Sequence, residues 1–579
     1  MSKLPIHPWL QPTPLLLWRW TRRFLIAGLI LAAGWASWKG LGIWAQQRLV
    51  TRAKIAIERG DLLAASLNIR HAHQINRNNV EIVRTVAELA EKIGSPEAVL
   101  WRNRLVQVEP GNLENRLALA NAALRFNELI LADRTLDAMP ESARNTGRWQ
   151  HAAGTLAVLL HRPDAAEAHL TRASRLDPSN TVFRLDLATL RMQSSKPGTA
   201  TTARQEIEEV SAQPEFRSQT LRALLADALA RNDGPAALAF ADRLVSVPAA
   251  LYQDRVIRLG TLYRFQKTGF PEELQRLQTL AGRVGSNVYE LTRWMNANGL
   301  SREAATWIEG RPIFIRRNPI AALALVETYE ALGDWKASRH FLDRSVWPGL
   351  EFSRLAHLAR AASGLGEPVN SRRIWKSAMA AAADDPVPLM MLARLCEKWK
   401  WPSELKEVCW KVARHPRHAR WALMTAFRTC RETGDTRGML QAVRRASEIM
   451  PSDAIARNNT ASLSLLLGED LAASRRTALD LHASSPSNTA YAATCAFALH
   501  LNGETRRALE LLAALPPGQL LDPHMAAYQG ILLAAAGDLA AAQKCLDLAK
   551  GARLLPEEQR LVNEARARIK SASPTKPAK

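Results

Sequence analysis

The segments GEDLAA (468–473), GETRRA (503–508) and GDLAAA (537–542) repeat one pattern at nearly equal spacing. Each begins with a residue that readily adopts the left-handed αL conformation, continues with polar or acidic residues, and ends on an alanine. This order ends one helix and begins the next, and the small alanine lets the two helices approach closely. The pattern therefore predicts a series of helical hairpins.

The same pattern recurs along most of the chain. Its clearest copies end on Ala65, Ala98, Ala132, Ala166, Ala237, Ala304, Ala473, Ala508 and Ala542. Degenerate copies are SKPG (195–198), TGFPEE (268–273), LGDWKAS (332–338), LGEPVNS (365–371), KWPSE (400–404) and TGDTRG (433–438). The alanines fall on a ladder with a period of about 34 residues, which is typical of an α-solenoid with about fifteen hairpins.

Two further features give the repeat an identity. Prolines follow the second helix of several repeats, and small residues recur in the first helix. These positions are Pro110, Pro178 and Pro451, and Ala188, Ala461, Ala496 and Gly530. With them, residues 47–569 resemble the tetratricopeptide repeat family. The resemblance implies an all-α, right-handed superhelix whose concave surface binds other proteins.

A different segment precedes the repeats. Residues 24–45 read FLIAGLILAAGWASWKGLGIWA, and Lys39 is their only charge. At 1.5 Å per residue this segment can cross a bilayer core of about 30 Å, so it predicts one transmembrane helix, with a cleaved signal peptide or a buried helix as alternatives. Arg22 and Arg23 favour a cytoplasmic N-terminus and repeats on the far side, as in a single-pass protein of a bacterial inner membrane.

The two ends of the chain differ from the rest. Residues 1–23 form a basic, proline-rich lead, and residues 570–579 lack apolar periodicity and predict a disordered basic tail. The formal net charge is +22. A spread positive charge indicates a solvated surface or attraction to anionic lipid or an acidic partner.

The search for chemistry predicts no catalytic residue, no cofactor and no metal ligand. The five cysteines show neither paired spacing nor a CxxC pair, and they read as small buried residues. Phosphate-binding loops, nucleophile elbows and HExxH motifs are missing from the sequence. We therefore expect a binding protein and not an enzyme.

The family resemblance also implies a binding strip. In such hairpins defined positions of the first helix line the concave face. Here these positions carry Tyr289, Arg293, Arg394, Trp421, Arg428, Arg431 and Asn458. The strip is cationic and partly aromatic, which suits an acidic or extended peptide. Solvated basic side chains without a partner are the alternative.

Tryptophan is concentrated in the same part of the chain. Nine of these residues, Trp294, Trp307, Trp335, Trp347, Trp375, Trp399, Trp401, Trp410 and Trp421, lie close together in sequence. They serve either as core packing or as an exposed binding patch. Together these features predict a membrane-anchored scaffold or assembly factor for protein partners. The alternatives are a helical-repeat protein that binds nucleic acid and a purely structural envelope protein.

Overall fold

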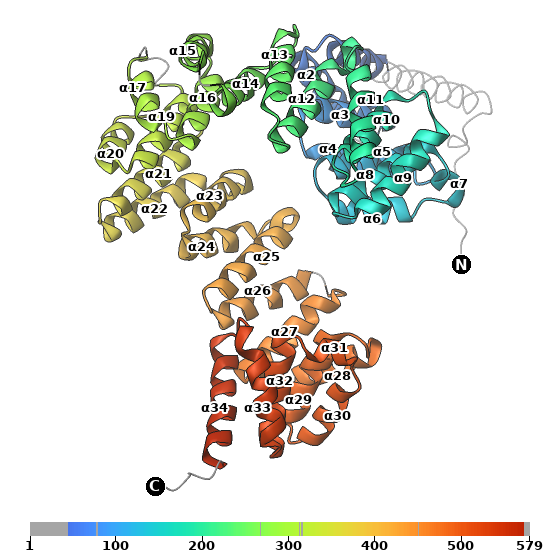
Figure 1. Cartoon of the computed structure of the whole chain (residues 1–579), viewed down its shortest axis with the longest axis vertical. Helices are drawn as coiled ribbons and strands as arrows, with labels where there is room; N and C mark the ends of the chain where they lie inside the picture. The colour runs from blue at the N-terminus through green and yellow to red at the C-terminus, as the bar shows by residue number, and fades with distance from the viewer. Residues whose placement is uncertain are drawn as a thin grey trace, which may run out of the picture. The chain divides into compact units, whose positions relative to one another are not determined.

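The computed structural model describes residues 44–572, except 77, 78, 267, 312, 314–316 and 450. All regular structure in this described part is helical (Figure 1). The chain divides into two compact bodies, an N-terminal body that ends at Leu274 and a C-terminal body that begins at Gln275.

In the N-terminal body residues 44–58 are helical and precede α2. The further helices are α2 (Leu62–Ile75), α3 (Val80–Ile93), α4 (Glu97–Val108), α5 (Leu113–Arg125), α6 (Leu129–Asp137), α7 (Glu141–Arg144), α8 (Gly147–Leu159), α9 (Pro163–Leu176), α10 (Thr181–Met192), α11 (Pro197–Val210), α12 (Pro214–Ala230), α13 (Gly234–Ser246) and α14 (Tyr252–Phe265), followed by α15 (Phe270–Ala281), which ends in the other body.

The C-terminal body continues the series. Its helices are α16 (Gly285–Ala297), α17 (Ser301–Glu309), α19 (Pro319–Leu332), α20 (Trp335–Asp343), α21 (Glu351–Gly364), α22 (Pro368–Ala382), α23 (Pro386–Trp399), α24 (Pro402–Val412), α25 (Pro416–Glu432), α26 (Thr436–Ile449), α27 (Ala454–Leu467), α28 (Leu471–Ser484), α29 (Thr489–Leu501), α30 (Thr505–Ala513), α31 (Pro517–Leu520), α32 (Pro523–Ala536), α33 (Leu539–Leu548), a short 3₁₀ turn (Ala549–Gly551) and α34 (Pro556–Ala572).

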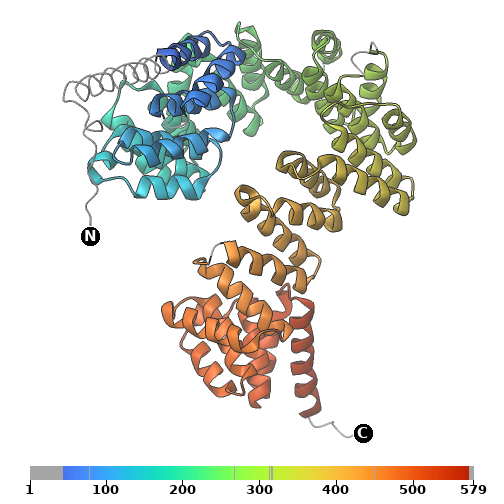
Figure 2. The same ribbon diagram turned by 180° about the vertical axis from the view of Figure 1, so that it is seen from behind.

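The helices form stacked hairpins, as the opposite views in Figures 1 and 2 show within each body. Thirteen of the fifteen predicted repeat turns, from the turn at Gly94 to the turn at Gly537, join two paired helices. The hairpins also continue through the stretches where the sequence pattern is degenerate, such as α10 with α11 and α23 with α24. The predicted all-α helical-repeat fold is confirmed, whereas the right-handed sense of the superhelix stays a prediction.

Left-handed residues end the first helix of many hairpins, as the sequence predicts. Besides glycines, the residues in this conformation include Asn127, His161, Asn232 and Lys400, with φ between 56° and 59°. Asparagine tolerates this conformation well, whereas lysine adopts it less readily. The hairpin geometry therefore holds even where the glycine is replaced.

Side-chain caps begin the helices. Asn488 and Asp522 accept backbone N–H bonds from the first turns of α29 and α32, and Asp538 does the same for α33. A cap of this kind contributes about 1 kcal/mol to helix stability. The prolines of the repeat follow helix ends as predicted, since α4 ends at Val108 and α9 at Leu176.

The alanine of the repeat is buried in almost every hairpin that carries it. Ala65, Ala132 and Ala508 are fully buried, like the other alanines of the ladder except one. Ala473 is exposed, and its neighbour Ser474 takes the buried position. The register shifts by one residue because Asp470 adopts a second left-handed conformation, two residues after Gly468, and α28 begins correspondingly later.

The tryptophan-rich region is core. Trp347, Trp375 and Trp399 are buried in the hydrophobic cluster that runs from α19 to α27, and the other six tryptophans of this region are partly buried. The Arg360 guanidinium lies against the Trp335, Trp399 and Trp401 rings, 5.3–6.0 Å from their centroids. None of the nine tryptophans is fully exposed, which favours core packing over an exposed patch.

The two ends of the chain lie partly outside the described residues. The predicted lead at 1–23 and all but Trp44 and Ala45 of the predicted span at 24–45 lie outside the described residues. Among the described helices, none has both the length and the apolar character needed to cross a bilayer. At the other end α34 runs to Ala572, three residues into the segment predicted to be disordered, because Ile569 still packs on the core of α32 and α33. Residues 573–579 lie outside the described part.

Candidate functional site

The first helices of the C-terminal body share one face, which we call the inner face. Its reference positions lie six residues before the left-handed residue of each hairpin. From α16 to α29 they are Arg293, Glu327, Arg360, Arg394, Arg428, Ser462 and Phe497. Equivalent positions on stacked hairpins point to the same side of the solenoid. The row is cationic with one acidic interruption as far as Arg428, and then becomes neutral.

Contacts between repeats show that this face is curved inward. Lys398 of α23 donates to Glu327 of α19 over 2.7 Å, although α21 lies between these two helices in the stack. The Glu327 carboxylate also accepts a bond from the Tyr289 hydroxyl of α16 over 3.1 Å. Side chains from three repeats thus meet above the inner face, which requires first helices that converge on this side.

Tyr289 is affected by its position. The side chain is half-buried, and burial together with the negative charge of Glu327 raises the pKa of Tyr289 to about 12. The phenol is therefore neutral and donates its proton to Glu327 at neutral pH. The Tyr289 hydroxyl holds the Glu327 carboxylate, which also accepts from Lys398, and we call these three residues the brace. The role of Tyr289 in partner binding stays a prediction.

The predicted cations occupy the inner face but are not all available. Arg293, Arg394 and Arg431 are exposed. Arg428 is also exposed and donates to Glu397 of the neighbouring helix over 2.6 Å. The predicted cationic strip is thus partly neutralised by carboxylates that the sequence analysis did not include.

The two remaining predicted residues are less accessible than these arginines. Trp421 is partly buried and packs on the hydrophobic cluster beneath α25. Asn458 of α27 is 5% exposed and lines a pocket near the C-terminal end of the solenoid. The predicted strip therefore separates into a central part on α16–α25 and a distinct pocket beyond it.

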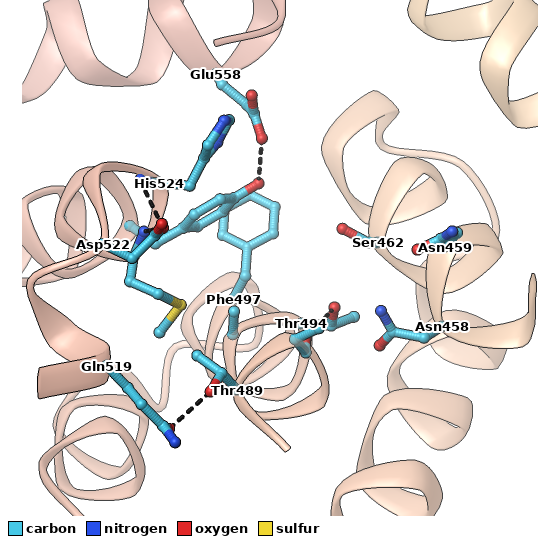
Figure 3. A pocket seen from close by; sticks show the side chains of 14 residues that line it. Asn458, Asn459, Ser462, Thr489, Thr494, Phe497, Gln519, Asp522, His524 and Glu558 are labelled. Atoms are coloured by element: carbon cyan, nitrogen blue, oxygen red, sulfur yellow. Dashed lines mark hydrogen bonds between the residues drawn. The ribbon is translucent and has the colours of Figure 1, made fainter. Parts of the chain in front are cut away.

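The pocket has a volume of about 530 Å³ and lies between α27, α29, α32 and α34 (Figure 3). Asn458, Asn459 and Ser462 form one wall, opposite Phe497 of α29 and residues of α32 and α34. The aromatic part of the lining is the pair Phe497 and Tyr528, whose ring centroids are 5.4 Å apart in an edge-to-face arrangement. The polar part includes Thr489, Thr494, Gln519, Asp522, His524 and Glu558.

Helix α34 closes the pocket on one side, and its placement depends on contacts far back in the chain. Pro556 lies against Gly434 in the α25–α26 turn, and Thr436 bonds to Glu557. Leu555 packs on Cys430, Met439 and Leu463. From this anchor α34 passes Tyr528 of α32, whose hydroxyl donates to Glu558 over 2.8 Å. A helix outside the repeat pattern therefore supplies one wall.

Metal-binding and thiol chemistry find no support at these surfaces. Within the described residues, His, Cys, Asp and Glu side chains do not gather in any group of three placed to hold a metal ion. Cys396, Cys409 and Cys430 are buried, and burial raises the pKa of Cys409 to about 12 and that of Cys430 to about 11. These thiols are protonated at neutral pH, as packing residues would be.

Some functional positions could have been found from the sequence and others could not. Glu397 and Lys398 follow Arg394 by one helical turn, so their place on the same face can be read from helical spacing. Glu327 belongs to the same row as Arg293 and Arg394. Glu558 lies on α34 beyond the last repeat, where no periodic position relates it to Tyr528.

Comparisons with known proteins give limited information. No protein-family model and no curated protein matches the sequence. Among solved structures, the APC/C hetero-tetramer Cut9–Hcn1 aligns with 11% identity and a TM-score of 0.28 over 78% of this chain and 96% of that chain. Pseudomonas aeruginosa pilF aligns with 13% identity and a TM-score of 0.29, over 39% of this chain and 97% of its own. A chain of the Naa15/Naa10 complex bound to HypK-THB aligns with 14% identity and a TM-score of 0.24, over 91% of this chain and 78% of that chain. TM-scores this low carry no argument about function.

Proposed function

We propose that the chain is a scaffold that binds partner proteins on the inner face of its C-terminal body. The observation that carries this proposal is the inward curvature of the face, which the bond between Lys398 and Glu327 two repeats away documents. A curved row of first helices presents side chains from several repeats to one extended or helical segment of a partner.

The composition of the central inner face supports the same function. Met424 is 61% exposed and lies four residues before Arg428, and Met391 is 40% exposed and lies three residues before Arg394. Methionine is an adaptable apolar contact, and arginine is enriched at energetically important interface positions. The combination suits an amphipathic segment that carries acidic side chains. The row of cations is interrupted at Glu327 and ends at Arg428, which is less suited to a nucleic-acid backbone.

The N-terminal sequence supports binding of partners at a membrane. We expect residues 24–45 to anchor the chain in a membrane, with the N-terminus in the cytoplasm and the repeats on the far side. Anchoring raises the effective concentration of a captured partner near the bilayer. Deletion of residues 1–46 should release the chain from carbonate-washed membranes, and a truncated chain that stays in the pellet would contradict the anchor.

The binding function is tested by affinity capture of the full-length chain from cross-linked native membranes, followed by mass spectrometry. The test variant is Arg428→Glu with Arg431→Glu. The matched control is Arg414→Glu with Arg437→Glu, which makes the same charge change at exposed positions of the α24 end and of α26. A defined set of proteins that is lost only in the test variant supports the proposal. Capture of nuclease-sensitive material, or an equal loss in both variants, contradicts it.

A further inference from the structure

The pocket beside α34 differs chemically from the central inner face, because three of its hydroxyl groups already donate hydrogen bonds within the protein. The Thr494 hydroxyl donates to the Ala490 carbonyl over 3.0 Å, and the Thr489 hydroxyl donates to Gln519 Oε1 over 2.7 Å. Tyr528 donates to Glu558 over 2.8 Å. A hydroxyl has one proton, so each of these oxygens can offer only lone pairs to an occupant of the pocket.

Apart from His524 and Tyr528, the titratable groups of the lining are the carboxylates of Asp522 and Glu558. Asp522 caps α32, where its Oδ1 accepts the backbone N–H bonds of His524 and Met525 over 3.0 and 3.1 Å. Glu558 accepts from Tyr528 and from the Leu555 backbone N–H. No lysine or arginine is among the lining residues. The pocket therefore combines two carboxylates with three hydroxyl oxygens that can only accept.

Asn458 supplies an independent indication of a ligand. The residue is 5% exposed, and its side-chain oxygen is buried without a hydrogen-bond partner in the described part of the chain. In Figure 3 the Asn458 amide faces the pocket opposite Thr494. A buried carbonyl oxygen that lacks a donor costs roughly 1–3 kcal/mol, which an incoming N–H group would recover.

The aromatic side chains narrow the choice of donor. Phe497 and Tyr528 line the same pocket as the acceptors, and the volume of about 530 Å³ is large enough for a long side chain. A guanidinium group carries five N–H donors in one plane and packs on aromatic faces, whereas an ammonium group is a compact, strongly hydrated charge. An acidic side chain would face two carboxylates without a neutralising cation.

We propose that this pocket takes the side chain of an arginine in an extended segment of a partner protein. The inference rests on the proposed function, since it assumes that proteins bind on the inner face. The arginine head group is bound by Asp522 and Glu558, and an N–H of the segment reaches Asn458. The partner segment thus carries an arginine at the pocket end of the inner face and acidic side chains toward Arg428.

The experiment selects peptides from a phage-displayed random 12-residue library on the purified full-length chain and measures selected peptides by fluorescence anisotropy. The variant Asp522→Asn with Glu558→Gln removes both charges and keeps side chains able to make the cap and the Tyr528 bond. The matched control is Asp453→Asn, which caps α27 with the same two backbone bonds but does not line the pocket.

We expect an arginine-containing class of peptides that binds about tenfold or more weakly to the double variant and normally to Asp453→Asn, as expected for lost charge-assisted hydrogen bonds. Replacement of the peptide arginine by citrulline should have the same effect. Asn458→Asp adds a third carboxylate and should strengthen binding, which tests the pocket even if the double variant is unstable.

Two results would overturn the inference, and they differ in what else they affect. Selected peptides that show no arginine preference, or that bind the pocket variants as tightly as the unchanged chain, contradict the arginine site. If those peptides still bind Arg428→Glu more weakly, the proposed scaffold function is retained. A library that yields no binding peptides contradicts both proposals.

Discussion

The central inner face and the terminal pocket occupy equivalent places in successive repeats but carry opposite chemistry. The central face on α23 and α25 presents Arg394, Arg428 and exposed methionines. One and two repeats further on, the same row carries Ser462 and Phe497, and the pocket beside them holds the carboxylates of Asp522 and Glu558. The repeat thus fixes where a side chain lies, whereas the residue at that place fixes what it binds.

A second difference concerns how each surface is supported. The central face lies on a tryptophan-rich core made by the repeats themselves. The pocket needs α34, a helix outside the repeats that is anchored at the α25–α26 turn. The two surfaces should therefore respond to different substitutions, and the following predictions separate them.

The largest effect is expected for Trp375→Ala beneath the central face. Trp375 is 2% exposed and its indole N–H donates to Glu407. Loss of a buried aromatic side chain costs about 3–5 kcal/mol of unfolding free energy. Urea denaturation followed by circular dichroism should show this loss, and Trp410→Ala, at a partly buried site, should cost clearly less. Equal effects would contradict the core assignment of Trp375.

Gly530→Ala should act on the pocket side instead. A Cβ atom at Gly530 would lie 2.7 Å from the Leu546 side chain, so α32 and α33 would have to separate. Such overpacking typically costs about 1–3 kcal/mol. Gly518→Ala is the control, because no atom lies within 4 Å of the added Cβ. Peptide binding at the pocket should weaken in Gly530→Ala while binding at the central face persists. Weaker binding at the central face than at the pocket would contradict the independence of the two surfaces.

The brace on the central face predicts a measurable titration. Burial and Glu327 raise the pKa of Tyr289 to about 12, so the folded chain keeps this proton between pH 10 and 12 while the unfolded chain loses it. The contribution to stability is therefore complete below pH 10 and is lost as the pH rises toward 12. In Glu327→Gln the ultraviolet titration of this tyrosine should move to lower pH. An unchanged titration would mean that Glu327 does not contact the phenol.

The smallest effect is expected for the rates at which cysteine thiols are labelled. These rates report on the central face and on the pocket without any substitution. Cys396, Cys409 and Cys430 lie under the central face, and Cys495 is buried on α29, whereas Cys545 on α33 is partly exposed. Under native conditions a disulfide reagent should modify Cys545 first, because the other thiols are buried and protonated. Early labelling of Cys430 would reveal opening where α34 is anchored.

Much of the fold could be predicted from the sequence because each repeat is specified locally. The left-handed residues, the caps and the buried alanines act within a few residues of one another, and they place hairpins even in degenerate units such as the one at Lys400. The single shifted alanine, Ala473, arises where Asp470 lengthens the turn. The tryptophans are core because they fill space between hairpins, which sequence spacing cannot distinguish from exposure.

The candidate sites were less predictable, since they depend on contacts between distant repeats. Arg428 was predicted on the inner face. Its pairing with Glu397 depends on how α23 and α25 are shifted along their axes relative to each other, which the sequence does not give. Asn458 was predicted as part of the binding strip and is only 5% exposed, on α27 where this helix packs against α29. The position of Glu558 follows from the long-range anchoring of α34 and has no local signal.

Site-specific photo-cross-linking tests most directly whether the inner face binds proteins. A benzophenone amino acid is placed at Met424, which is 61% exposed on the inner face, or at Val369, which is 84% exposed on the second helix α22. After irradiation of native membranes, adducts of the full-length chain are identified by mass spectrometry. Binding on the inner face predicts a defined protein adduct at Met424 that is missing at Val369. Equal adducts at both positions, or adducts at Val369 alone, would contradict the proposed binding face.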